Sequence, residues 1–167
     1  MEPATGPQGA QHTAGATSGT PTYVDFVCFR VDPVFRRLAR GERAGAAAEF
    51  LAAVRSAASR VEVRPYATMG FRADCDFLFW LIAKDLEAFQ RFVSALVSTQ
   101  LGRYLNVTYA WVGMTKTSPY FKGHKQRFEM GPSTAKYLFV YPFTKSHAWY
   151  QLPYERRREL MSVHNEV

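Results

Sequence analysis

The chain lacks any long hydrophobic run: the roughly 18 consecutive apolar residues that a membrane-spanning helix needs occur nowhere in it. Cysteine is also scarce, because only Cys28 and Cys75 occur, far apart and without a Cys-x-x-Cys pair. This spacing argues against a disulfide framework or a zinc knuckle, and predicts two free thiols that are buried or half-buried. The N-terminus has neither the apolar core of a secretory signal nor the arginines of a transit peptide. These absences predict a cytoplasmic protein without a membrane span.

Acidic residues are fewer than basic ones, 14 against 21, so the net charge is +7 and an anionic partner is expected. The net charge alone does not distinguish three kinds of anionic partner: nucleic acid, a membrane surface and a polycarboxylate ligand. Apolar residues make up 47% of the chain, as in a globular protein. Residues 1–21 are an exception, because small and polar residues dominate them, and we expect a disordered N-terminal tail.

Hydrophobic periodicity predicts a first domain over residues 22–118. The expected order is a strand over 22–31, a helix over 32–58, strands over 61–71 and 76–83, a helix over 86–104 and a strand over 107–114. Pro65 favours an edge position or a bulge, and Asp85 is the expected N-cap of the second helix. The order β-α-β-β-α-β is that of the ferredoxin-like unit, so the predicted fold class is α+β.

The pattern restarts after a polar connecting loop over residues 119–135. A strand over Tyr137–Phe143 and a helix from about Pro153 predict that residues 136–167 begin a second, incomplete unit of the same kind. Alternation along the strand would place Tyr141 and Lys145 on one face, roughly 13 Å apart, which is the scale of a large flat ligand. The alternative is that Tyr141 is a core aromatic and Lys145 a strand-end cation.

The helix from Pro153 carries a histidine on its apolar side. Arg156, Arg157, Arg158 and Glu159 form the expected polar side, whereas Leu160, Met161 and His164 form the apolar one. His164 is either a satisfied core residue or an iron ligand whose second ring nitrogen meets Glu159 or Glu166. In the connecting loop, His124 and Arg127 stand among lysines and aromatic residues, as in a solvated basic loop or a phosphate or nucleic-acid contact.

Several motifs in register carry a family resemblance. They are Tyr141-Pro-x-x-Lys145, Trp149-Tyr-x-Leu-Pro153, Arg157-x-x-x-Met161-x-x-His164, and His124 upstream on the loop. From about Tyr120 to Val167 the chain resembles the coproheme decarboxylase branch of the chlorite dismutase-like haem proteins, in its actinobacterial form. The resemblance implies a dimeric α/β barrel of two ferredoxin-like units, the second truncated here, and a homopentamer. In members of this family, the second domain continues past the proximal histidine with further strands.

The resemblance also implies an activity. Iron coproporphyrin III (coproheme) would be decarboxylated oxidatively to haem b with hydrogen peroxide, the last step of coproporphyrin-dependent haem biosynthesis. His164 would be the proximal iron ligand, His124 the general base toward peroxide, and Tyr141 the radical that abstracts hydrogen from a propionate. Lys145 and Arg127 would bind propionates, and Trp149 would pack or hydrogen-bond near the pocket. A transient contact with the ferrochelatase that supplies coproheme is a further expectation.

Two other functions remain open at this point. One is a chlorite dismutase-like haem peroxidase, whose expected distal arginine would fall beyond Val167. The other is non-catalytic haem binding, in which the porphyrin binds without turnover. His124 and the pair Tyr141 and Lys145 favour decarboxylation over both, and nucleic-acid binding is not expected.

Overall fold

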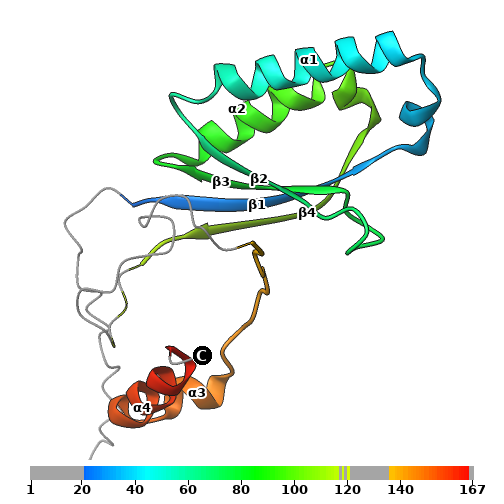
Figure 1. The fold of residues 1–167 in the computed structure, drawn as a ribbon. Helices are drawn as coiled ribbons and strands as arrows, with labels where there is room; N and C mark the ends of the chain where they lie inside the picture. Colours follow the sequence, from blue (N-terminus) through cyan, green and yellow to red (C-terminus); the bar gives the residue numbers. More distant parts are fainter. Residues whose placement is uncertain (1–20, 117, 119, 121–135, 166–167) are drawn as a thin grey trace, which may run out of the picture.

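The computed structural model describes residues 21–116, 118, 120 and 136–165. Its first part has the predicted order of elements: β1 (Tyr23–Val31), α1 (Arg40–Ser56), β2 (Glu62–Ala67), β3 (Phe77–Ala83), α2 (Leu86–Val97) and β4 (Leu105–Met114). The strands form one antiparallel sheet in the order β2-β3-β1-β4, and α1 and α2 cover one face of it (Figure 1). The predicted α+β, ferredoxin-like unit is therefore confirmed.

Two sets of side chains cover the two faces of the sheet. Phe29, Leu81 and Leu96 are fully buried between the sheet and the helices. On the opposite face Cys28, Cys75, Leu78, Trp80 and Ile82 form a second buried cluster, against which Leu138 packs. Both cysteines are free and buried, as predicted. Burial and the neighbouring Cys75 raise the pKa of the Cys28 thiol to about 12, so it is a poor nucleophile.

The two predicted helices are shorter than their hydrophobic patterns suggest. Before α1 the chain forms a separate 3-10 turn, η1 (Pro33–Arg37), because the carboxylate of Asp32 accepts from the N–H of Val34 and Leu38 is extended. After α2 it forms another, η2 (Leu101–Tyr104). The backbone packs closely there, since a Cβ at Gly102 would clash with the carbonyl oxygen of Leu96. Single helices over 32–58 and 86–104 were wrong predictions for these local reasons.

The β2–β3 connection is longer than the predicted turn and is held by polar contacts. Arg72 and Asp74 form a two-point ion pair at 2.8 Å, and the Tyr109 hydroxyl donates to Asp74 at 2.6 Å. These bonds hold the pKa of Asp74 well below its usual value and raise that of Tyr109. Gly70 takes a φ of +85°, which favours glycine. Pro65 lies in the edge strand β2, as predicted.

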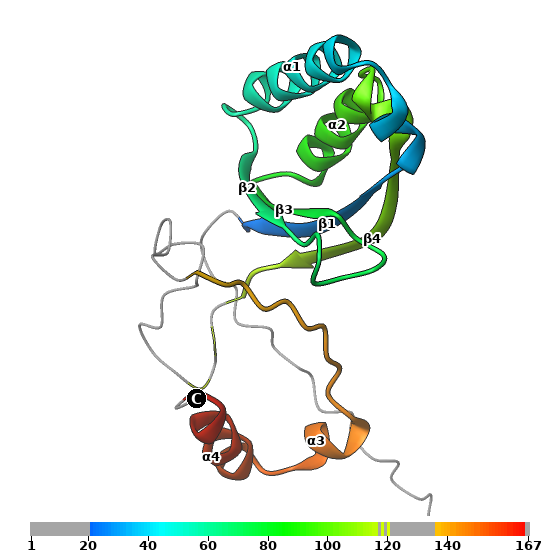
Figure 2. The same cartoon turned by 45° about the vertical axis from the view of Figure 1, so that its right-hand side comes forward.

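The C-terminal part differs from its prediction in one important respect. Residues 137–146 form neither helix nor strand, so the predicted strand over Tyr137–Phe143 was wrong. A strand needs a neighbouring ladder for its N–H and C=O groups, and no described strand pairs with this segment, which leads away from the sheet (Figure 2). Two helices follow, α3 (His147–Gln151), which was not predicted, and α4 (Tyr154–Asn165), which was. Among the described helices none has the length and apolarity needed to cross a membrane.

Candidate functional site

Tyr141 lies on an exposed row of aromatic side chains between the sheet and α3. Tyr137, Phe139, Tyr141 and Phe143 are 70%, 82%, 63% and 65% exposed. The alternating Leu138 and Val140 are half-buried, and Leu138 contacts the cluster under the sheet. Exposed and half-buried residues thus alternate from Tyr137 to Tyr141, and the rings of Tyr141 and Phe143 lie 6.3 Å apart.

Lys145 leaves this row and is half-buried among apolar groups. Its Nζ atom lies 4.8 Å from the ring centre of Trp149 and 5.8 Å from that of Tyr120. It also lies 3.9 Å from the sulfur of Met161. We call Tyr120, Lys145, Trp149 and Met161 the lysine cluster. Ring faces attract the ammonium, so the cluster holds one positive charge in a fixed, partly desolvated place.

Helix α3 positions Trp149 in this cluster. The side chain of Ser146 caps its N-terminus by accepting from the N–H of Trp149, and a helix over five residues places the indole next to Lys145. A serine three residues before the tryptophan of the Trp-Tyr-x-Leu-Pro string was therefore the local signal for α3.

One face of α4 turns toward the lysine cluster. Tyr154, Arg157 and Met161 follow each other at helical spacing on this inner face, and position 164 comes next on it. Tyr154 stacks on Tyr120 at 5.6 Å, and Met161 contacts Lys145. The described residues do not include the side chain of His164, so its predicted iron ligation stays a prediction.

Arg157 was predicted on the polar side of α4 with Arg156 and Arg158, but it is less exposed than they are. Its side chain is half-buried, and its Nε atom is buried without a hydrogen-bond partner among the described residues. Three consecutive helical residues spread over about 200° of the helix surface, so Arg156, Arg157 and Arg158 do not all face solvent. The run of three arginines was thus the available signal that one of them turns inward.

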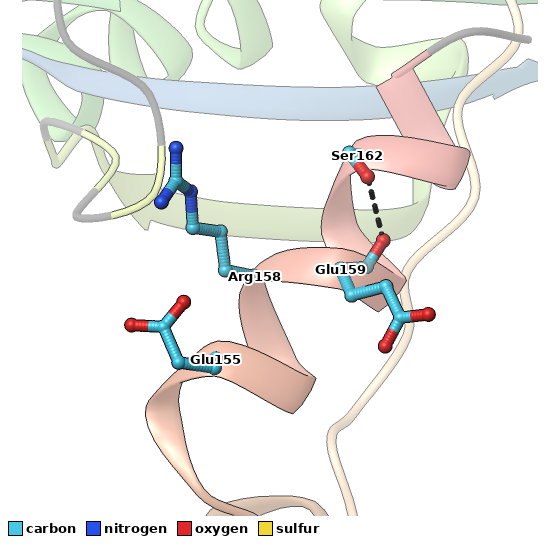
Figure 3. A pocket seen from close by; sticks show the side chains of 4 residues that line it. All are labelled: Glu155, Arg158, Glu159 and Ser162. Atoms are coloured by element: carbon cyan, nitrogen blue, oxygen red, sulfur yellow. Dashed lines mark hydrogen bonds between the residues drawn. The ribbon is translucent and has the colours of Figure 1, made fainter.

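The outer face of α4 carries a shallow hollow that none of the predicted site residues lines. Glu155, Arg158, Glu159 and Ser162 line it, all from this one helix (Figure 3). The Ser162 hydroxyl donates to the carbonyl oxygen of Glu159 at 2.7 Å, and Arg156 pairs with the Glu159 carboxylate at 2.6 Å. Glu159, one of two predicted partners of His164, is therefore engaged elsewhere. Two carboxylates make this hollow a poor place for a polyanion.

The structure brings some predicted site residues together and leaves others open. Lys145 and Trp149 meet in the lysine cluster, beside the helix that carries position 164. Tyr141 lies on the row that leads into it. His124 and Arg127 lie outside the described residues. Met161, Tyr120 and Arg157 were not predicted as site residues.

The described side chains fit a flat ligand with several carboxylates. Aromatic rings offer stacking surfaces, Lys145 offers a fixed cation, and the buried Nε of Arg157 has no acceptor among the described residues. No group of three or more His, Cys, Asp or Glu side chains converges in the part of the chain that the structure describes.

Comparisons with known proteins agree on a family. The family model described as chlorite dismutase matches residues 43–167. The coproheme decarboxylase of Mycolicibacterium smegmatis is 37% identical over 100 residues, which cover 59% of this chain and 43% of that protein. The chlorite dismutase of Ideonella dechloratans is 31% identical over 155 residues, which cover 88% of this chain and 54% of that protein.

Solved structures lead to the same family. Chlorite dismutase from Candidatus Nitrospira defluvii, in complex with imidazole, aligns with a TM-score of 0.76 at 26% identity, over 87% of this chain and 63% of that one. The chain thus spans about half the length of the curated relatives it matches.

Proposed function

Because the chain belongs to the chlorite dismutase-like family, we propose that it binds iron coproporphyrin III and decarboxylates two of its propionates, giving haem b. The observation that carries this proposal is the lysine cluster. It fixes a cation beside aromatic rings, next to the helix that carries position 164. The identity of 37% to a coproheme decarboxylase supports the same substrate.

The reaction needs a two-electron oxidant for each propionate. A propionic acid side chain becomes a vinyl group by losing carbon dioxide, two hydrogen ions and two electrons. Hydrogen peroxide accepts those electrons and hydrogen ions and becomes two molecules of water. Two molecules of peroxide therefore account for both vinyl groups and for two molecules of carbon dioxide.

The chain's own residues have separate roles in this proposal. Lys145 binds a propionate carboxylate, and Trp149 keeps its ammonium in place. Arg127 contacts a second carboxylate, and His164 is the protein ligand to the iron. The bound iron porphyrin supplies the redox chemistry that activates peroxide.

Proton and hydrogen transfer fall to two other residues. His124 accepts a proton from peroxide, since the pKa of an imidazole suits a general base near neutral pH. Tyr141 loses its phenolic hydrogen, and the resulting tyrosyl radical takes a hydrogen atom from the propionate β-carbon. Its ring is 63% exposed in this structure, so a ligand has access to the phenol.

The remaining predictions concern the whole protein. We propose that residues 22–118, 119–135 and 136–167 are a first domain, a connecting loop and part of a haem-binding domain that pairs with the first in one barrel. A pentamer in the cytoplasm and a transient contact with a ferrochelatase complete this proposal. Each rests on the family and on the chain's share of its relatives' length.

The function is tested by mixing the protein with coproheme and adding peroxide in steps. We expect a Soret band on binding, and then successive masses that correspond to the loss of one and of two carboxyl groups, ending at haem b. Coproheme and peroxide without protein are the control. If the protein binds coproheme and two equivalents of peroxide leave all four propionates intact, the decarboxylase proposal is wrong.

A second function is favoured by the identity of 31% to a chlorite dismutase over most of this chain. In that case the haem-loaded protein would decompose chlorite to chloride and dioxygen. An oxygen electrode distinguishes the two, because a decarboxylase without chlorite activity releases no dioxygen when chlorite is added.

A further inference from the structure

Arg157 carries a positive charge that no described residue neutralises. Its side chain is half-buried, and its Nε atom is buried without a hydrogen-bond acceptor. The ion pairs of the described chain engage other arginines, namely Arg64, Arg72, Arg91 and Arg156. A buried guanidinium N–H without an acceptor is costly, so an acceptor from outside the described chain is the simplest explanation.

Helix geometry brings Arg157 close to Lys145. Arg157 and Met161 are four residues apart on α4, which places their Cβ atoms about 6 Å from each other. The Nζ atom of Lys145 lies 3.9 Å from the sulfur of Met161. Arg157 and Lys145 are therefore both neighbours of Met161, one through helix spacing and one through direct contact, and two cations so placed repel each other unless an anion joins them.

The described carboxylates of α4 do not fill this role. Glu155 and Glu159 line the hollow on the outer face of the helix with Arg158 (Figure 3). The inner face from Tyr154 to Met161 therefore carries the cation of Arg157 and no described carboxylate. Arg157 and position 164 are seven residues apart, or about 10 Å along the helix axis, a distance that a tetrapyrrole with its side chains can bridge.

We propose that Arg157 binds a carboxylate of the porphyrin substrate and forms, with Lys145, one anion subsite on the inner face of α4. This inference rests on the proposed function, and it adds a specificity residue to it. A guanidinium can grip a carboxylate through two parallel N–H bonds, whereas an ammonium acts as a point charge. Arg157 would thus favour porphyrins that carry a carboxylate at this subsite over those that carry a neutral group there.

The experiment measures binding of metal-free coproporphyrin III by fluorescence, together with its neutral tetra-amide. We expect Arg157→Leu to weaken binding of the tetracarboxylate about tenfold to a hundredfold and to leave the tetra-amide nearly unchanged. Arg157→Lys should recover part of the loss. Arg158→Leu is the matched control, because it removes the same charge from the outer face of the same helix and should leave both affinities unchanged.

The outcomes separate this inference from the proposed function. The inference is overturned if Arg157→Leu binds the tetracarboxylate as Arg158→Leu does, or if it loses both ligands equally, as a packing residue would. The proposed function fails differently: the unaltered protein would then bind the tetracarboxylate no better than the tetra-amide, and that result overturns both. Circular dichroism of each variant shows that α4 is still formed.

Discussion

Lys145→Met separates a ligand-binding lysine from a structural one. In the structure the ammonium lies 4.8 Å from the Trp149 ring centre and is half-buried. A cation–π contact of this kind stabilises the fold by about 1 kcal/mol. Methionine keeps most of the side-chain length and makes its own contact with an aromatic ring, which offsets part of that loss. The free energy of unfolding should therefore change by less than about 1 kcal/mol.

The effect on substrate binding should be larger. A charge-assisted hydrogen bond to a carboxylate contributes about 1.5 to 3 kcal/mol, which is roughly a 10- to 150-fold change in affinity. Fluorescence titration with metal-free coproporphyrin III measures the affinity, and denaturant unfolding measures the stability. Lys136→Met is the control, because Lys136 is an exposed lysine of the same segment. The role of Lys145 in carboxylate binding would be refuted if Lys145→Met and Lys136→Met bound coproporphyrin III with equal affinity. It would also be refuted if Lys145→Met lost more free energy of unfolding than free energy of binding.

Three further outcomes concern the ferredoxin-like unit. Leu81 is fully buried, so Leu81→Ala should cost about 3 to 5 kcal/mol in denaturant unfolding, whereas the same change at Leu51, which is 51% exposed, should stay within about 0.5 kcal/mol. Burial raises the pKa of Asp25, one of whose oxygens has no partner among the described residues, so its ionised form opposes folding. This loss of stability begins as the pH rises above 3.8, the pKa of an ordinary aspartate. Asp25→Asn should therefore raise the melting temperature at neutral pH but not in acid. Equal shifts in melting temperature at both pH values would contradict this role of Asp25. A Cys28 pKa of about 12 leaves roughly one thiolate in ten thousand at pH 8, so thiol reagents should label it only after unfolding, and rapid labelling of the native protein would show that it is not buried.

Most of the first domain could be predicted because its central elements bury regular apolar patterns. Strands β1 and β3 and helix α2 contribute buried residues to one core, so their apolar period and their burial agree. The failures occurred where contacts distant in sequence decide the backbone. Nothing in the apolar spacing around Gly102 indicates that the chain folds back on the end of α2 there.

The site was predicted less completely, for two physical reasons. Alternation over Tyr137–Phe143 is the same in an extended chain and in a strand, and only a neighbouring ladder distinguishes them. Arg157 was assigned to the polar side of its helix by residue type alone, although it is half-buried and lies one helical turn from Met161. Lys145 and Trp149, chosen by family motif, do lie together. His124 and Arg127 lie outside the described residues, so their roles stay predictions.

The most direct test of the account is the fate of coproheme in Tyr141→Phe. Tyr137→Phe is the matched control, because Tyr137 belongs to the same exposed aromatic row. Each variant is loaded with coproheme, treated with two equivalents of peroxide and analysed by mass spectrometry. We expect Tyr141→Phe to bind coproheme normally and to keep all four propionates, while Tyr137→Phe yields haem b. Haem b formation by Tyr141→Phe at the rate of the unaltered protein would contradict the assignment of the radical to Tyr141.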